Sequence, residues 1–184
     1  MRIVGGDRKG TALAAPKGDG TRPTSDRLRE TIFNILAHRF AEQLEGGRVL
    51  DLFAGSGAMG LEAISRGAAF ALFVENAIAA RGALRTNIDA LKAVGRTRVW
   101  RRDATKLGDC PVPPFDLVFC DPPYGHGLGE RALAGAATGG WLAPAAVAVL
   151  EERRGATPVS IPAWEAIETR EVGDSAISLW RHTG

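Results

Sequence analysis

The stretch VLDLFAGSGAMG at residues 49–60 decides the fold, because it joins an apolar run to a glycine-rich turn. The first half is typical of a buried strand, and the residues after the turn favour a helix. Glycines that follow a parallel strand let the backbone approach a ligand closely, at the edge where doubly wound folds bind nucleotides. The spacing of Gly55, Gly57 and Gly60 satisfies G-x-G-x-x-G in this context, so we expect a nucleoside cofactor here.

Acidic residues at the ends of the expected strands bear on which cofactor binds. Glu75 closes the second strand, 20 residues after Gly55, where a carboxylate can accept from both ribose hydroxyls. Asp51 either braces the loop or reaches the amino-acid portion of S-adenosylmethionine, and Asp103 can accept from an adenine amine. The glycine spacing also fits a nicotinamide dehydrogenase, and a purely structural turn is the remaining alternative. The expected cofactor site comprises Asp51, Phe53, Ala54, Gly55, Ser56, Gly57, Glu75, Asn76, Asp103 and Ala104.

A second motif, Asp121-Pro122-Pro123-Tyr124, follows the apolar strand expected at residues 115–120. The exocyclic amine of a base is a poor nucleophile, because its lone pair is delocalised into the ring. A carboxylate and a backbone carbonyl can each accept one amine hydrogen and aim the lone pair at a methyl group, while a flat ring stacks on the base. We therefore expect Asp121, Pro122, Pro123 and Tyr124 to form the catalytic site of an amino-methyltransferase, with a plain strand-ending turn as the alternative.

Strands and helices alternate along the chain, which predicts a doubly wound α/β fold. Near-continuous apolar runs such as Ala-Leu-Phe-Val suit a parallel sheet that is covered on both faces. Two strands around Gly173-Asp174 predict that the sheet ends in an antiparallel hairpin, and residues 1–15 predict a short N-terminal β-hairpin. The expected strands are 1–5, 11–15, 48–53, 69–75, 97–102, 115–120, 145–151, 166–172 and 176–181, and the expected helices are 25–44, 57–66, 78–93 and 128–137.

Charge is concentrated at the start of the chain. Residues 1–29 hold seven Arg or Lys and three Asp, a balance of +4 that leaves −2 for the rest. A basic arm on a near-neutral body suggests a polyanionic partner, and an ordinary solvated surface is the alternative. The apolar stretches are too short to span a membrane and the start has no apolar signal region, so we expect a cytoplasmic protein. Cys110 and Cys120 match no zinc spacing, and we expect no metal.

The two motifs together resemble those of the small-subunit ribosomal RNA guanine-N2 methyltransferases of bacteria. The resemblance covers nearly the whole chain. Its most specific part is the segment TRPTSDRLRE at residues 21–30, and it also includes RIVGG at 2–6, Phe33-Asn34, VLDLFAGSG at 49–57, GLEA at 60–63 and Asp121-Pro122-Pro123-Tyr124. It implies a seven-stranded, Rossmann-like S-adenosylmethionine methyltransferase sheet at residues 24–184, with a basic extension at 1–23.

The resemblance also implies a substrate, the N2 amine of one guanine in 16S ribosomal RNA, on an assembled or nearly assembled small subunit. We expect the protein to be a monomer and phosphates near the target loop to contact Arg2, Arg8, Lys9, Arg22, Arg27 and Arg29. An internal ion pair with Glu30 or Asp26 is the alternative for Arg22 and Arg27. The residues alone leave the base open, because a carboxylate, a carbonyl and a stacking ring also serve adenine N6.

Overall fold

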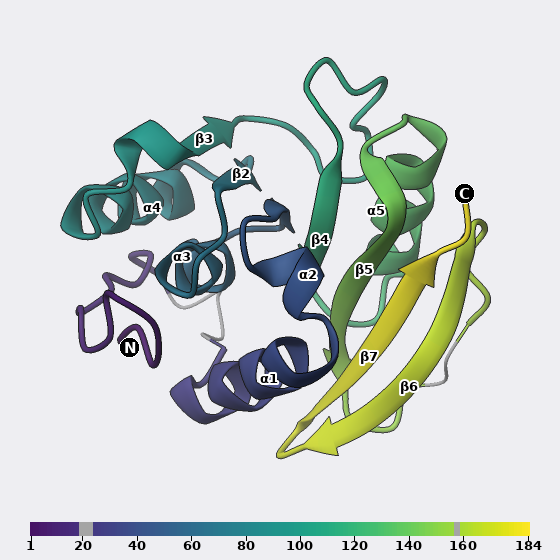
Figure 1. Cartoon of the computed structure of the whole chain (residues 1–184), viewed down its shortest axis with the longest axis horizontal. Coiled ribbons are helices and arrows are strands. Elements are labelled where there is room, and N and C mark those ends of the chain that lie inside the picture. The colour runs from purple at the N-terminus through teal and green to yellow at the C-terminus, as the bar shows by residue number, and fades with distance from the viewer. Residues whose placement is uncertain (19–23, 157–158) are drawn as a thin grey trace.

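The structure is a computed structural model that describes residues 1–18, 24–156 and 159–184. Within these residues, seven strands form one sheet in the order β3-β2-β1-β4-β5-β7-β6 (Figure 1). Strands β1 to β5 pair in parallel, and β7 lies antiparallel between β5 and β6. The bounds are β1 Arg48–Leu52, β2 Phe70–Val74, β3 Thr97–Trp100, β4 Phe115–Cys120, β5 Leu142–Arg153, β6 Trp164–Val172 and β7 Ser175–His182. The doubly wound sheet with an antiparallel end is confirmed.

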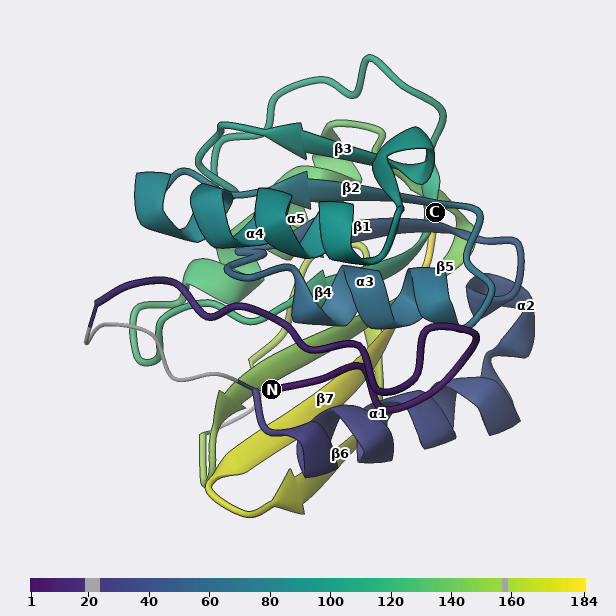
Figure 2. The ribbon, with the colours of Figure 1, turned by 90° about the vertical axis from the view of Figure 1, so that its left-hand side faces the viewer.

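Helices cover both faces of the sheet, and the strand residues alternate between the two cores. Leu61 of α3 and Leu84 of α4 pack with Val49 of β1 on one face. Leu133 of α5 packs with Leu50 of β1 on the other face. Figure 2 shows α1, α3 and α4 in front of the sheet. The helices are α1 Asp26–Arg39, α2 Ala41–Leu44, α3 Ala58–Ser65, α4 Ile78–Ala90 and α5 Leu128–Thr138, with a 3₁₀ turn at Val94–Arg96. This alternation explains why the apolar strands are nearly continuous.

The first long helix differs from the expectation of one helix over residues 25–44. Ser25 is the N-cap, and its hydroxyl accepts from the backbone N–H of Leu28. The helix then ends at Arg39, since Phe40 leaves helical geometry with φ −136°, and α2 begins at Ala41. Because Phe40 and Leu44 remain buried, the apolar stripe continues across the break.

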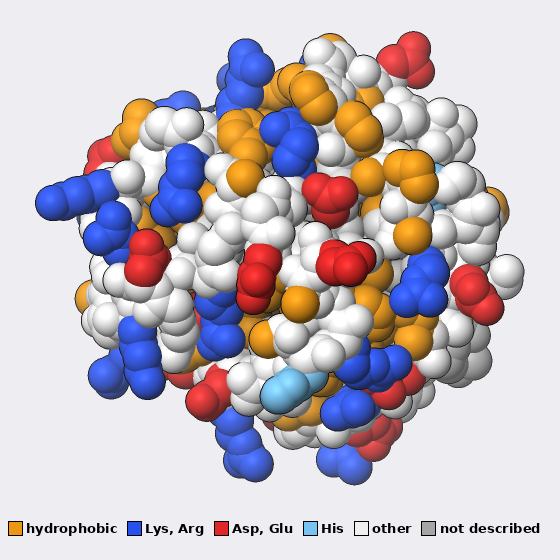
Figure 3. Space-filling view, in the orientation of Figure 1, with side chains coloured by type: hydrophobic (Ala, Val, Ile, Leu, Met, Phe, Trp, Pro, Cys, Tyr) orange, Lys and Arg blue, Asp and Glu red, His pale blue; other side chains and the backbone are white. Residues whose placement is uncertain are grey.

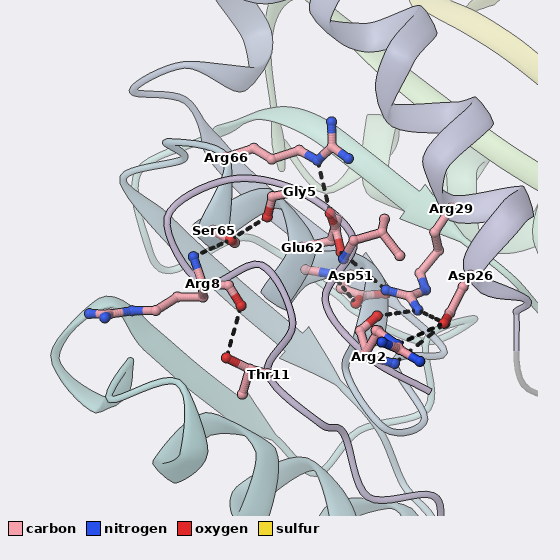
Figure 4. A network of polar contacts seen from close by, with 12 residues as sticks. Arg2, Gly5, Arg8, Thr11, Asp26, Arg29, Asp51, Glu62, Ser65 and Arg66 are labelled. Carbon is pink, nitrogen blue, oxygen red and sulfur yellow. Dashed lines mark hydrogen bonds and ion pairs between the residues drawn. The ribbon is translucent and has the colours of Figure 1, made fainter.

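The N-terminal hairpin is present in abbreviated form. Antiparallel pairing is confined to a bridge between Arg2 and Ala12, with Ile3 N–H donating to Thr11 O at 2.9 Å. The segment is not a free arm, because Ile3 is fully buried and Val4 N–H donates to the Glu62 carboxylate of α3 at 3.0 Å. Figure 4 shows this attachment of the first residues to α3. The expected boundary at residue 23 lies outside the described residues.

None of the described helices combines the length and hydropathy that a bilayer-spanning helix needs.

Candidate active site

A cleft of about 1120 Å³ opens at the carboxyl edge of the parallel strands. The two motifs meet there because β1 and β4 are neighbours in the sheet, with Leu52 opposite Cys120. Residues of the start of α1, of the end of β5 and of the β6–β7 turn complete the walls. Of the residues expected at the site, the cleft is lined by Asp51, Phe53, Ala54, Gly55, Ser56, Glu75, Asn76, Asp121, Pro122, Pro123 and Tyr124.

The loop after β1 depends on its glycines at two positions. Gly57 has a φ of +80°, and a Cβ built there would lie 2.2 Å from the Leu84 side chain, so the loop packs against α4 only with glycine. Gly55 has a φ of +56° and faces open space in the cleft. The loop therefore presents bare backbone toward any ligand that occupies the cleft.

Two carboxylates fix the shape of this loop. Asp51 Oδ2 accepts the Gly60 N–H at 2.9 Å, and burial raises the pKa of Asp51 well above its ordinary value. Glu75 Oε2 accepts the Gly55 N–H at 2.8 Å, while its Oε1 accepts the Ala77 N–H at 2.8 Å. Of the two roles left open for Asp51, the geometry supports loop bracing. Each Glu75 oxygen keeps a second lone pair, so it can also accept from a ligand hydroxyl in the cleft.

The structure does not bring Asp103 and Ala104 to the described walls of the cleft. They follow β3, two strands away from β1 in the sheet. The Asp103 carboxylate accepts from both the backbone N–H and the hydroxyl of Thr105, which lowers its pKa. Ala104 is buried. Gly57 is also buried and does not line the cleft, although it belongs to the loop after β1. A contact between Asp103 and an adenine amine stays a prediction.

Asp121 begins the loop after β4, and its carboxyl group has an unusual acidity. Its Oδ2 accepts from the Thr24 hydroxyl at 3.1 Å, and the same hydroxyl lies 3.4 Å from Glu151 Oε2. Burial and the nearby Glu151 charge raise the pKa of Asp121 to about 8, although the Thr24 hydrogen bond opposes the rise. Near neutral pH the carboxyl group therefore exchanges a proton readily.

The ring of Tyr124 is tethered at its hydroxyl. The hydroxyl donates to Glu151 Oε1 at 3.1 Å and lies 3.4 Å from Ser175 Oγ, while Ser175 Oγ donates to the same carboxylate oxygen at 2.7 Å. The Arg153 guanidinium lies 6.0 Å from the ring centroid. Sequence reasoning missed Thr24, Glu151 and Ser175 as members of the site. Glu151 had an available signal, because it lies near the carboxyl end of a parallel strand next to β4.

The basic residues expected to contact RNA do not all reach the surface. Arg2, Arg8, Lys9 and Arg27 are exposed, and Arg27 also lines the cleft. Figure 3 shows Lys and Arg side chains scattered over one face of the molecule, with Asp and Glu between them. Arg22 lies outside the described residues.

The expected contact between Arg29 and an RNA phosphate is wrong, because the Arg29 side chain is fully buried. It pairs with Asp26 and with Glu62, and it donates to the carbonyl of Arg2 (Figure 4). Such a cation is held by counter-charges inside the protein and cannot touch a phosphate. An internal ion pair was an alternative for Arg22 and Arg27 but not for Arg29, where the structure has one.

Comparisons with known proteins agree with this arrangement. The family model described as "Conserved hypothetical protein 95" matches residues 1–181. The chain is 38% identical over 98% of its length to the "Ribosomal RNA small subunit methyltransferase D" of Escherichia coli, of which it covers 89%. A "Putative rRNA methyltransferase YlbH" of Bacillus subtilis is 39% identical over 67% of each chain. The solved "Putative methyltransferase yhhF from Escherichia coli" superposes with a TM-score of 0.82 at 34% identity, over 99% of this chain and 97% of that one. The chain therefore belongs to the ribosomal RNA small subunit methyltransferase D family, and it is a methyltransferase.

Proposed function

We propose that this methyltransferase transfers a methyl group from S-adenosylmethionine to the exocyclic N2 amine of one guanine in 16S ribosomal RNA. One observation carries the proposal: the glycine loop and Asp121–Tyr124 line the same cleft. The names of the relatives support a ribosomal RNA substrate. We place the reaction on an assembled or nearly assembled small subunit, in the cytoplasm, with a monomer as the working form.

The glycine loop fits S-adenosylmethionine. The cleft is large enough for a nucleoside and a base together, and Gly55 offers open backbone where a side chain would intrude. Glu75 lies beside this backbone with lone pairs left to accept from ribose hydroxyls. The cofactor supplies an electrophilic methyl group on a sulfonium, which leaves as a neutral thioether. The described residues contain no cluster of three or more His, Cys, Asp or Glu that could hold a metal ion.

Asp121 and Tyr124 position the base. In its ionised form the Asp121 carboxylate accepts one hydrogen of the amine and turns the nitrogen lone pair toward the methyl group. The amine nitrogen becomes strongly acidic as the new N–C bond forms, and Asp121 or water then takes its proton. Tyr124 provides a flat surface for stacking, held in place through its hydroxyl. The guanine must leave its stack to enter the cleft, which costs least in a loop of the RNA.

Mass spectrometry of 16S ribosomal RNA tests the proposal. Small subunits from a strain that lacks this protein should gain one N2-methylguanine when incubated with the protein and S-adenosylmethionine. Asp121→Ala should lower the rate at least about 100-fold while calorimetry shows unchanged cofactor binding. Asp109→Ala, which removes an exposed carboxylate outside the cleft, is the matched control. Methylation of adenine N6 instead, or tight binding of NAD without binding of S-adenosylmethionine, would refute the proposal.

A further inference from the structure

Two acidic side chains lie together in the cleft. Cys120 of β4 is opposite Leu150 of β5 in the parallel register, so Asp121 and Glu151 are the next residues along the two adjacent strands. Thr24 Oγ1 lies 3.1 Å from Asp121 Oδ2 and 3.4 Å from Glu151 Oε2. One hydroxyl oxygen therefore has both carboxylates within reach.

The hydroxyl groups around this pair supply too few hydrogens. The Thr24 hydroxyl has one hydrogen, which can go to Asp121 or to Glu151 but not to both. Ser175 and Tyr124 both donate to Glu151 Oε1, while the Thr24 hydroxyl lies 3.4 Å from Glu151 Oε2. Repulsion from Glu151 contributes to the raised pKa of Asp121. When Asp121 is ionised, the cleft thus presents two adjacent acceptors that a ligand with two adjacent N–H groups would satisfy.

The Watson–Crick edges of the bases differ in this respect. Guanine carries N1–H beside its N2 amine, so it presents two neighbouring N–H donors. Adenine and cytosine instead have an unprotonated ring nitrogen beside the amine. The lone pair of that nitrogen would face the second carboxylate, and a buried acceptor opposite another acceptor is strongly unfavourable.

We propose that Glu151 determines base specificity by accepting the N1–H of guanine, while Asp121 accepts from the N2 amine. The order of strands supports this division, because β4 is next to β1 and β5 is one strand farther from the glycine loop. Asp121 is therefore the acid closer to the methyl donor. The inference rests on the proposed function and adds to it the residue that selects the base.

One other reading of the same geometry makes a different prediction. In that reading Asp121 alone accepts from both N1–H and the amine, and Glu151 serves only to hold Tyr124. A residue that only holds the ring affects all stacked bases alike. Replacing a residue that accepts N1–H changes the methylation rate of bases that carry this hydrogen by a different factor than that of bases that lack it.

The experiment replaces the methylated guanine, once mapped, by 2-aminopurine in small subunits reconstituted from ligated RNA. This base keeps the 2-amine but has no N1–H. 6-Thioguanine, which alters position 6 and keeps N1–H, is the control base. Wild-type protein should methylate 2-aminopurine with a kcat/KM about 10- to 100-fold below that for guanine, as expected for losing one hydrogen bond to a charged acceptor. It should methylate 6-thioguanine at nearly the guanine rate.

Glu151→Gln should bring the guanine to 2-aminopurine ratio close to one, because an amide can accept from N1–H or donate to an unprotonated N1. Glu152→Gln is the matched control: it removes the adjacent charge, and Glu152 lines a separate, smaller hollow with Glu130. It should leave the ratio unchanged. If wild-type protein methylates guanine and 2-aminopurine equally well, or if Glu151→Gln keeps the wild-type ratio, the inference fails while the proposed function stands. If guanine itself is not methylated at N2, the proposed function fails first.

Discussion

Raising the pH from 6.5 to 8.5 should increase the kcat/KM of methyl transfer about 25-fold, if the ionised form of Asp121 is the one that accepts the amine hydrogen. With a pKa of about 8, this carboxyl group is mostly protonated at the lower pH and mostly ionised at the higher one. The profile of kcat/KM reports the free enzyme, so the pKa of the empty cleft applies. Guanine N1 also stays protonated over most of this pH range.

The neighbours of Asp121 predict how its acid limb should move. Its pKa is raised by burial and by the charges of Glu151 and Glu152 from β5, and lowered by the Thr24 hydrogen bond. The charges of Asp51, on β1, and Asp121 also repel each other. Glu151→Gln should shift the limb to lower pH, because a repelling charge is removed. Thr24→Val should shift it to higher pH, because a hydrogen bond to the carboxylate is removed.

The assay is single-turnover methylation of small subunits by tritiated cofactor at constant ionic strength, with substrate well below KM. Glu152→Gln should move the limb in the same direction as Glu151→Gln but less, since the Glu152 charge raises the pKa of Asp121 less than the Glu151 charge does. A flat or falling kcat/KM between pH 6.5 and 8.5 would refute the assigned role of Asp121. So would a shift in the same direction for Glu151→Gln and Thr24→Val.

Three other substitutions test separate parts of the structure. Tyr124→Ala should weaken RNA binding about 10- to 100-fold by removing the stacking surface, while Tyr124→Phe should retain most of it; equal losses in a binding assay would contradict stacking. Glu62→Gln should lower the free energy of unfolding by about 3 kcal/mol in urea titrations, because it breaks a buried ion pair with Arg29, and a loss under 1 kcal/mol would contradict this. Arg27→Gln should reduce the salt dependence of RNA binding by about one counterion, and an unchanged slope would rule out a phosphate contact.

Periodicity and glycine placement predicted most of the sheet, because they report on local burial. The bounds of β4 agree with the expected strand, and the strands of the final hairpin differ from it by two residues or fewer at each end. The break at Phe40 was not predictable in this way. The side chains of Phe40 and Leu44 are both buried, so the apolar pattern is the same for one helix or two.

The residues of the candidate site were also only partly predictable from the sequence. Residues that follow a strand directly, such as Gly55 and Asp121, could be placed because the carboxyl ends of parallel strands meet at one edge. Thr24 and Ser175 could not, since they reach the cleft from the segment before α1 and from an antiparallel strand. Arg29 was misplaced because a count of charges contains no information on burial, and its two acidic partners come from different helices.

The first residues of the chain and the glycine loop after β1 belong to one packed unit through α3. At the start of this helix, the Gly60 N–H is held by Asp51 of β1. Toward its end, Glu62 accepts from Val4 N–H, and the Ser65 hydroxyl accepts from Arg8 N–H at 2.9 Å. The backbone that carries the exposed side chain of Arg8 is therefore fixed relative to the glycine loop by hydrogen bonds to a single two-turn helix. A phosphate bound there would consequently have a defined distance to the site of methyl transfer, which is what selecting one base in a large RNA requires.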